Sequence, residues 1–417
     1  MFLALACARN EQALVSDADP SAQEVPRNDV GGVAPEDVVP VADEPEIEPG
    51  DTGEPGDEDD DELLGSDPGE ASFLFDEGSV HDFWIELDDE AQDSLSADPF
   101  TEVRAMFVYE GDPWEVGLRL KGSNSFRTLD GKPSFKVDFH EWHEYARFFG
   151  KKRLTLNNMI QDRTLLREHT YYWIAAQVGI PAPRHGYARV YVNGDYYGLY
   201  GIVESMDEQF IDRVWPEDDE GSLWESSGAD VTWDHDWFDL DEEGIGEVED
   251  LVEVVEDTDP DDWLDMLDEH FHDGSLFRYW ALDVLAGNPD GYIYNRHNYH
   301  LYYAPIADRW FLVPWGTDRS FTREGAPVHG SETQPIRGAL VAGCLDDGDC
   351  RDRFDEAVLD MADAWDALDV YAFVEAAEAA IREAAEEDPR REDGWDPDDI
   401  EEFVREAAEG VRRQLGD

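Results

Sequence analysis

The fold of this chain is decided by one stretch, Gly287-Asn288-Pro289-Asp290-Gly291-Tyr292-Ile293-Tyr294-Asn295-Arg296-His297-Asn298-Tyr299-His300-Leu301-Tyr302. Glycine, proline and asparagine around Asp290 predict a turn, and the aromatic residues that follow predict a strand. An aspartate on a turn held by a rigid scaffold can accept a proton, and an asparagine carboxamide can ligate a metal ion. The stretch therefore predicts a polar site where a turn enters a strand.

A second, apolar run supports that site. The residues Trp310-Phe311-Leu312-Val313-Pro314-Trp315 predict a buried strand, and Asp318 follows its carboxyl end. The order aspartate, asparagine, strand and aspartate is the one in which protein kinases present a catalytic base and two metal ligands. Spacing alone does not decide the matter, because acids on loops are usually solvated or cap a helix.

Composition and charge limit the class of protein. The chain has 417 residues, of which 41% are hydrophobic, and its 14 Trp, 16 Tyr and 20 Phe suffice for one large domain or two lobes. Its net charge is −71, and only 21 of the 102 acidic residues lie in the first 70 positions. A solvated acidic surface adapted to salt is the simplest interpretation, and nucleic acid and anionic membranes are poor partners for it.

One segment departs from this acidic charge. Between residues 119 and 153, nine basic residues stand against four acidic ones. All the lysines of the chain lie there: Lys121, Lys132, Lys136, Lys151 and Lys152. The segment predicts either a concentrated anion site, for which phosphate fits best, or a set of salt bridges to acidic neighbours.

The N-terminal region predicts an exported protein. Residues 1–7 resemble a lipoprotein signal remnant, because Ala4-Leu5-Ala6-Cys7 is similar to a lipobox. The apolar run is short and no basic residue precedes it, so either the true start lies upstream or the match is accidental. Residues 8–70 are acidic and rich in proline, and we expect a disordered linker there. A membrane-anchored lipoprotein or a cell-surface protein fits both features.

Two cysteines allow a small disulfide. Cys344 and Cys350 flank Leu-Asp-Asp-Gly-Asp, and their pairing would favour an oxidising compartment.

Periodicity and turn signals predict a mixed α and β domain from residue 71 onward. We expect strands at 73–75, 82–87, 104–109, 114–121, 134–139, 151–157, 184–193, 196–204 and 310–315. We expect helices at 88–95, 162–178, 207–213, 275–286, 353–368, 370–386 and 397–415. Residues 241–262 predict an acidic surface insertion, and residues 319–352 predict a loop.

The basic segment contains a turn that can hold anions. The run 121–127, Lys-Gly-Ser-Asn-Ser-Phe-Arg, offers amides and the hydroxyls of Ser123 and Ser125 to phosphate oxygens, although it could equally be an ordinary hairpin turn. The strand that follows places Lys136 on one face, and we expect its side chain to point inward. Glu168 could pair with Lys136, as a helix glutamate does in kinases, or could lie on the surface.

Taken together, these runs resemble the CotH kinase family, the spore coat protein H group of atypical protein kinases. The matching runs fall in family order and span about 72–330: Leu118 to Ser125, Lys132 to Phe139, Asp162 to Arg167, Val190 to Glu204, Asn288 to Tyr302, and Val313 to Asp318. The resemblance implies an α+β, two-lobed, atypical protein-kinase-like fold with a helical C-terminal region. The small lobe would span 71–204 and the large lobe 205–417.

The resemblance also implies ATP, a divalent metal (Mg²⁺ or Mn²⁺) and transfer to Ser or Thr of a protein substrate. Asp290 would be the catalytic base, Lys136 would hold the nucleotide phosphates and Asp318 would ligate metal. Asn295 matches the kinase spacing and Asn298 matches the family motif better, so both are candidate metal ligands. The remaining residues expected near the nucleotide are Lys121, Ser123, Ser125, Arg167 and Glu204.

One departure from the family pattern concerns the metal ligands. Many members read Trp-Asp-x-Asp where this chain has Trp315-Gly316-Thr317-Asp318, so the first acid is missing. The alternative to an active kinase is therefore a pseudokinase that acts as a surface binding or adhesion protein. A calcium-loaded acidic surface protein is weaker, because the acids form no EF-hand loop.

Overall fold

The computed structural model describes residues 70–226, 228–232, 235–322, 326–392 and 394–416. The predicted signal remnant with Cys7 lies outside the described residues, and so does the predicted linker except for its last residue. The described residues form a mixed α and β structure, which confirms that part of the predicted fold class.

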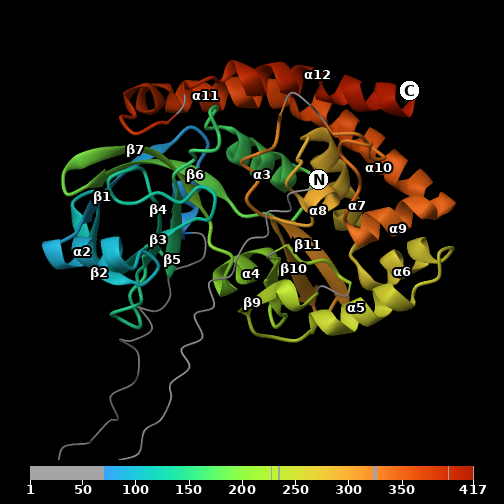
Figure 1. The fold of residues 1–417 in the computed structure, drawn as a ribbon, viewed down its shortest axis with the longest axis horizontal. Coiled ribbons are helices and arrows are strands. Elements are labelled where there is room, and N and C mark those ends of the chain that lie inside the picture. The colour runs from blue at the N-terminus through green and yellow to red at the C-terminus, as the bar shows by residue number, and fades with distance from the viewer. Residues whose placement is uncertain (1–69, 227, 233–234, 323–325, 393, 417) are drawn as a thin grey trace, which may run out of the picture. The chain divides into compact units, whose positions relative to one another are not determined.

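The first part of the described chain is a closed barrel of seven strands (Figure 1). In spatial order the strands are β1 (Val80–Glu86), β2 (Val103–Tyr109), β3 (Asp112–Lys121), β4 (Ser134–Asp138), β5 (Arg153–Asn157), β7 (Asp195–Val203) and β6 (His185–Val192). All neighbours are antiparallel except β1 and β6, whose parallel pairing closes the barrel. Closure removes the exposed edges that an open sheet would leave.

The barrel encloses its own apolar core, because alternate residues of each strand point inward. Phe83, Phe107, Phe139 and Phe148 are fully buried there and pack ring to ring.

The 3₁₀ helix η1 (Glu70–Phe75) and helix α2 (Asp89–Ala97) lie in the same part of the chain. The strand predicted at 73–75 is therefore wrong, since those residues are helical.

Helix α3 (Arg167–Gln177) connects β5 to β6 and begins five residues later than predicted. The reason is the side chain of Asp162, which stabilises the turn before the helix. Its Oδ1 accepts a hydrogen bond from the amide of Thr164 at 2.8 Å, and its Oδ2 accepts one from the amide of Arg167 at 2.9 Å. The chain therefore makes a capped turn where a helical turn was expected.

The second part is built on a four-stranded antiparallel sheet in the order β11 (Arg309–Pro314), β10 (Tyr299–Ala304), β8 (Leu223–Ser226) and β9 (Phe238–Glu242). Its helices are α4 (Glu208–Val214), η2 (His235–Trp237), α5 (Val248–Asp257), α6 (Trp263–His270), α7 (Asp273–Leu285), α8 (Tyr292–Asn295), α9 (Ala339–Asp346), α10 (Gly348–Leu368), α11 (Val370–Glu387) and α12 (Asp398–Leu415). None of the helices in the described ranges is long and apolar enough to cross a membrane.

The acidic segment 241–262 is folded. Val248, Leu251, Val252 and Val255 of α5 are buried in the large core, and the acidic side chains of the helix occupy other positions around its axis. An amphipathic helix of this kind needs a core to cover its apolar face. The prediction of a surface insertion overlooked this periodicity.

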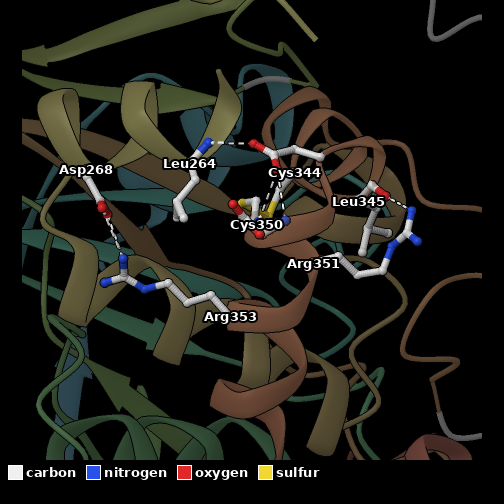
Figure 2. The surroundings of a disulfide bond; sticks show 9 residues. Leu264, Asp268, Cys344, Leu345, Cys350, Arg351 and Arg353 are labelled. Carbon is white, nitrogen blue, oxygen red and sulfur yellow. Dashed lines mark hydrogen bonds and ion pairs between the residues drawn. A yellow bond between two sulfur atoms is a disulfide. The ribbon is translucent and has the colours of Figure 1, made fainter. Parts of the chain in front are cut away.

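The loop predicted at 319–352 contains helix α9 and the disulfide between Cys344 and Cys350, which confirms that pairing (Figure 2). Asp347 lies between the cysteines and accepts hydrogen bonds from the amides of Asp349 at 2.9 Å and of Leu264, at the start of α6, at 3.2 Å. Figure 2 also shows Arg353 of α10 paired with Asp268 of α6 at 2.9 Å. The disulfide turn thus joins α9, α10 and α6.

The segment between α11 and α12 contacts the barrel. Asp388 pairs with Lys132 at 2.6 Å, and the Arg390 guanidinium donates to the backbone carbonyls of Asp130 and Leu129 at 3.0 and 3.2 Å. The same segment reaches the start of α3, where the Trp395 indole donates to the Thr164 carbonyl at 3.1 Å. We call residues 388–399 the C-terminal brace. It joins the β3–β4 connection to the turn that precedes α3.

Candidate functional site

Asp290 lies on the turn between α7 and α8, and three side chains surround it. The Asn295 amide donates to Asp290 Oδ1 at 2.7 Å, and the Asn298 amide donates to the Asp290 carbonyl at 3.2 Å. Arg319 Nη1 lies 3.4 Å from Asp290 Oδ2. The predicted turn thus orients the carboxylate of Asp290 and brings both candidate asparagines to it.

Asp318 follows β11, and the next residue along the chain, Arg319, is the one that contacts Asp290. Removal from water raises the pKa of Asp318 to about 8, and the charges of Glu168, Asp162 and Asp290 act in the same direction, opposed by Arg319. The negative charges of several carboxylates therefore act on Asp318, and few positive charges compensate them. Such a surplus of negative charge is typical of a place where a cation binds.

Gly316 stands where many family members have an acid, and its backbone has a φ of +53°. A Cβ at this position would lie 3.0 Å from Oδ1 of Asn298. The carboxamide oxygen of Asn298 therefore faces the loop that carries Asp318, whereas the Asn295 amide is engaged with Asp290. This arrangement favours Asn298 over Asn295 as the asparagine nearer a cation at Asp318.

Lys121 lies at the end of β3, between the barrel and these loops. Burial lowers its pKa to about 8, as does the charge of Lys136, and the carboxylates of Glu168, Glu225 and Asp318 oppose that shift. Its ammonium also lies 5.7 Å from the ring centre of Trp315. Lys121 therefore brings a positive charge from the barrel into the region of Asp318.

Glu168 is only 4% exposed at the start of α3. Its carboxylate accepts hydrogen bonds from Asn157 at 3.0 Å and from the Tyr172 hydroxyl at 3.1 Å, and Lys121 is the cation whose charge acts on it most strongly. The suggestion that Glu168 lies on the surface is wrong. The suggested pair of Glu168 with Lys136 is absent from the described residues, and the positive charge that acts on Glu168 is that of Lys121.

Lys136 pairs with Arg119 across the β3–β4 ladder and is the exposed residue of its strand. It therefore points out of the barrel, contrary to the expectation of an inward side chain. Partial removal from water lowers its pKa, and repulsion from Arg119 adds to this, while Glu225 and Asp241 oppose it. Within the described residues, no acidic group lies within ion-pair distance of the Lys136 or Lys121 ammonium.

Both lysines line a cavity of about 220 Å³. Its lining combines cations, acids and apolar groups from both parts of the chain: Lys121, Lys136, Arg153, Leu154, Thr155, Ser205, Met206, Asp207, Glu225, Asp241, Glu242, His300 and Trp315. A larger hollow of about 630 Å³ lies beside α9, and it contains none of the residues that the sequence singled out. We take the smaller cavity as the candidate site because two of the predicted residues, Lys121 and Lys136, line it.

The β3–β4 turn lies next to Lys121. Gly122 has a φ of +118°, and a Cβ there would lie 3.0 Å from the amide nitrogen of Phe126, so the turn requires glycine. Ser123 is exposed and Ser125 is half-buried, and the Ser125 carbonyl accepts a hydrogen bond from Asn158 at 3.0 Å. Neither serine is among the residues that line the cavity. Their contact with a nucleotide stays a prediction.

Two residues expected near the nucleotide have other contacts. The Arg167 guanidinium is buried and pairs with Asp399 of the C-terminal brace at 2.8 Å. Glu204 is 1% exposed, and three cations surround its carboxylate: Arg184 and Arg213 at 2.7 Å and Lys151 at 3.0 Å. Burial would raise the pKa of Glu204, but these cations lower it to about 2. Their contacts give both residues a structural role outside the cavity lining.

Both interpretations of the basic segment, a set of salt bridges and an anion site, therefore apply, each to different lysines. Lys132, Lys151 and Lys152 form salt bridges with Asp388, Glu204 and Glu208. Lys121 and Lys136 remain as the cations of the cavity.

Sequence reasoning missed four polar residues of the site: Arg319, Glu225, Asp241 and His300. Arg319 directly follows the predicted Asp318, so its position could have been noticed. Glu225, Asp241 and His300 belong to three different strands, β8, β9 and β10, and only the pairing of those strands brings them together. No local spacing could have indicated that.

The residues present fit a divalent cation and a nucleotide. Oxygen donors from Asp318 and Asn298 stand beside further carboxylates, and the charge of Asp318 is poorly compensated, as its raised pKa shows. Lys121 and Lys136 supply two cations in the adjoining cavity, where phosphate oxygens could be held.

Comparison with known proteins gives one family. The model of the CotH kinase protein family matches residues 118–412. The inner spore coat protein H of Bacillus subtilis (strain 168) is 25% identical over 243 residues, which cover 53% of this chain and 64% of that protein. The chain thus spans less than two thirds of the length of this relative.

Two solved structures show only a distant similarity. They are the Helicobacter pylori proinflammatory kinase CtkA and the Shewanella oneidensis MR-1 HipA–HipB–operator DNA complex. Each has a TM-score of 0.32. CtkA is 10% identical, and the match covers 67% of this chain and 94% of CtkA. The matched Shewanella chain is 11% identical, and the match covers 81% of this chain and 74% of that chain. These values are too low to carry a conclusion. The family match covers more than half of the sequence, and the chain belongs to the CotH kinase protein family.

Proposed function

We propose that this chain is an ATP-dependent protein kinase of the CotH type with a two-lobed, kinase-like fold. It would transfer the γ-phosphoryl group to Ser or Thr of extracytoplasmic or surface proteins. The observation that carries the proposal is that Asp290, held by Asn295, contacts Arg319 next to Asp318, while the charges of Asp318 and Glu168 act on Lys121 in the cavity lining. These groups come from distant parts of the sequence, and their residue types match those that phosphoryl transfer needs.

In this proposal Asp290 orients the attacking hydroxyl and accepts its proton. The hydrogen bond from Asn295 and the nearby Arg319 guanidinium hold its carboxylate in place. Asp318 and Asn298 would hold Mg²⁺ or Mn²⁺, with Asn295 as the alternative to Asn298. The metal, when bound, neutralises phosphate charge and polarises the phosphoryl group.

Lys121 and Lys136 would bind the phosphate oxygens of ATP, and Glu168 would orient Lys121. The lowered pKa of Lys121, about 8, still leaves most of its ammonium charged at neutral pH. Glu168 is itself fixed by Asn157 and Tyr172, so it can serve as a rigid support. The serines of the β3–β4 turn, Ser123 and Ser125, would lie over the phosphates.

Phosphoryl transfer and nucleotide titration on the full chain test the proposal. Asp290→Asn keeps the size of the side chain but removes the proton acceptor, so transfer of radiolabelled phosphate should fall about 10²- to 10⁴-fold while Mg²⁺-ATP still binds. Asp318→Asn removes a charged metal ligand, so metal-dependent ATP affinity should fall together with transfer. Unchanged transfer and unchanged ATP affinity in both variants would remove the kinase assignment.

The lysines supply a second test with a matched control. Lys121→Ala and Lys136→Ala should weaken ATP binding more than Lys152→Ala, because Lys152 lies outside the cavity lining and pairs with Glu208. Equal losses in all three variants would indicate general electrostatic attraction in place of a defined site.

A second candidate function is a nucleotide-binding pseudokinase that acts as a surface binding or adhesion protein. The observation that favours it is Gly316, which replaces the first acid of the family motif. This function predicts ATP binding without transfer, so the same two assays separate it from the first. The spore coat protein among its relatives supports an extracytoplasmic place of action, and a lipid anchor at Cys7 is part of this proposal.

A further inference from the structure

Three metal-ligating side chains line the same cavity as the lysines. Glu225 comes from β8, Asp241 from β9 and His300 from β10. One potential ligand atom of each lies within 4.8 Å of the other two. All three residues line the cavity of about 220 Å³, so an ion could reach them from it.

His300 distinguishes this cluster from an ordinary group of surface acids. Its side chain is 1% exposed, and its ring lies edge-on to Trp315 with centroids 5.6 Å apart. Nε2 lies 3.0 Å from Asp241 Oδ2, and Nδ1 is buried without a hydrogen-bond partner within the described part of the chain. A buried imidazole with an unsatisfied nitrogen is costly unless a further ligand or proton arrangement compensates it.

The carboxylates of the cluster are also poorly compensated. Among the described residues, the Glu225 carboxylate has no hydrogen bond or ion pair, and the Asp241 carboxylate contacts only His300. The neighbouring Arg153 guanidinium is engaged with Asp138 at 2.9 Å, and Lys136 lies beyond ion-pair distance. The cluster therefore keeps two carboxylate groups and one imidazole available for a cation.

The spacing fits coordination after a small adjustment. Ligand atoms about 2.1 Å from one ion lie at most about 4.2 Å apart. The ligand atoms of the cluster lie within 4.8 Å of one another, and the His300 and Asp241 atoms are 3.0 Å apart, so a small rotation of the partly exposed Glu225 and Asp241 can bring all three to one ion.

We propose that Glu225, Asp241 and His300 form a binding site for one divalent transition-metal ion, separate from the cation site at Asp318. The imidazole selects against Ca²⁺ and Mg²⁺, which prefer oxygen ligands alone, and favours ions such as Co²⁺, Ni²⁺ or Zn²⁺. Three protein ligands facing a cavity leave open positions for water or for an anion, and Lys121 and Lys136 line the same cavity. The proposal does not rest on phosphoryl transfer.

A second cluster shows why the histidine matters. Glu102, Asp138 and Glu141 also lie within 4.8 Å of one another, but all three are carboxylates. Arg153 and His140 already bind Asp138, and Arg119 lies 3.8 Å from Glu102. That cluster is explained by its protein partners and supports no metal site.

The test is a Co²⁺ titration of the full chain without nucleotide, followed by visible absorption. Excess Ca²⁺ is present throughout, so that it occupies weak sites on the acidic surface. We expect one equivalent of Co²⁺ to produce absorption bands of a nitrogen-ligated ion, and one equivalent of Zn²⁺ to displace them. Glu225→Gln and His300→Gln should each weaken this binding at least 10-fold, since each removes one of three ligands.

Two controls separate the site from its surroundings. Glu243→Gln removes one charge from the same acidic region without touching the cluster, and Asp318→Asn alters the other cation site, so both should keep the Co²⁺ bands. Thermal melts check that His300→Gln remains folded, and the half-buried Glu225 supplies the milder variant. Bands that persist in Glu225→Gln, or that disappear equally in Glu243→Gln, would overturn the proposal. Loss of Co²⁺ binding only in Asp318→Asn would overturn it as well, while leaving the kinase proposal intact.

Discussion

The ion pair between Lys132 and Asp388 should be one of the most sensitive points for the stability of this protein. Their side chains are 1% and 0% exposed, and Nζ lies 2.6 Å from Oδ2. Lys132 Nζ also donates to the Leu199 carbonyl at 2.8 Å, while Asp388 accepts from the amides of Leu199 at 3.1 Å and Arg390 at 2.9 Å. Each charge is therefore held by the other and by backbone groups, with no access to water.

Lys132→Met keeps the length of the side chain and removes the ammonium. The carboxylate of Asp388 then stays buried with two amide donors and no cation. Breaking a buried pair in this way costs about 3–5 kcal/mol, whereas an exposed pair is worth about 0–1 kcal/mol. The double variant Lys132→Met/Asp388→Asn removes both charges and keeps a carbonyl acceptor for the amides, so we expect it to recover at least half of the loss.

The assay is guanidinium chloride unfolding of the full chain, with Lys152→Met as the control. Lys152 pairs with Glu208, whose side chain is 49% exposed, so this variant should lose no more than about 1 kcal/mol. The loss in Lys132→Met should also persist in high salt, because solvent ions do not reach the pair. A Lys132→Met protein as stable as Lys152→Met, or a double variant less stable than the single one, would refute this reasoning.

Three further predictions concern other parts of the fold. Burial raises the pKa of Asp283 to about 7, so the stability that the protonated carboxyl contributes is present in acid and is lost as the pH rises through about 7. Asp283→Asn should therefore flatten the fall in melting temperature between pH 4 and 7. An unchanged slope in this variant would contradict the prediction. Replacing Cys344 and Cys350 together by alanine opens a short loop and should lower the free energy of unfolding in denaturant by about 2 kcal/mol. A wild-type protein that keeps its full stability after reduction of the disulfide would contradict this prediction. Gly316→Asp should lower the melting temperature without metal, because φ at this position is +53° and Asn298 is close. The new carboxylate should also increase the rise in melting temperature that Mn²⁺ produces. The control variant Gly316→Ala should show only the lower melting temperature.

The sequence was informative wherever a local signal decided the outcome. The hairpin β6–β7 follows from Asn193-Gly194, and the contact between Asn295 and Asp290 follows from their spacing of five residues on a tight turn. Alternating residues located β2 and β3, and the apolar run before Asp318 located β11. In these places the information lies within about ten residues of the chain, so propensity and periodicity suffice.

The sequence failed where the partner of a side chain lies far along the chain. Nothing near Lys121 in the sequence indicates that the charges of Glu168 and Asp318 act on it, whereas the strand of Lys136 matches a family motif. The resemblance predicts Arg167 and Glu204 near the nucleotide, and their observed partners are Asp162 and Asp399 for Arg167 and the cations at positions 151, 184 and 213 for Glu204. Which carboxylate meets which cation is decided by tertiary packing, and no local pattern records it.

The C-terminal brace has a consequence for how the protein is made. Residues 388–399 contact both the β3–β4 connection and the turn before α3, through Asp388, Arg390, Trp395 and Asp399. A ribosome releases this segment only after the barrel strands and α3, which precede it in the sequence, have emerged. Until then Lys132 lacks Asp388, and Arg167 has Asp162 but lacks Asp399. A nascent chain that stops before residue 388 therefore leaves the buried ammonium of Lys132 without an acidic partner.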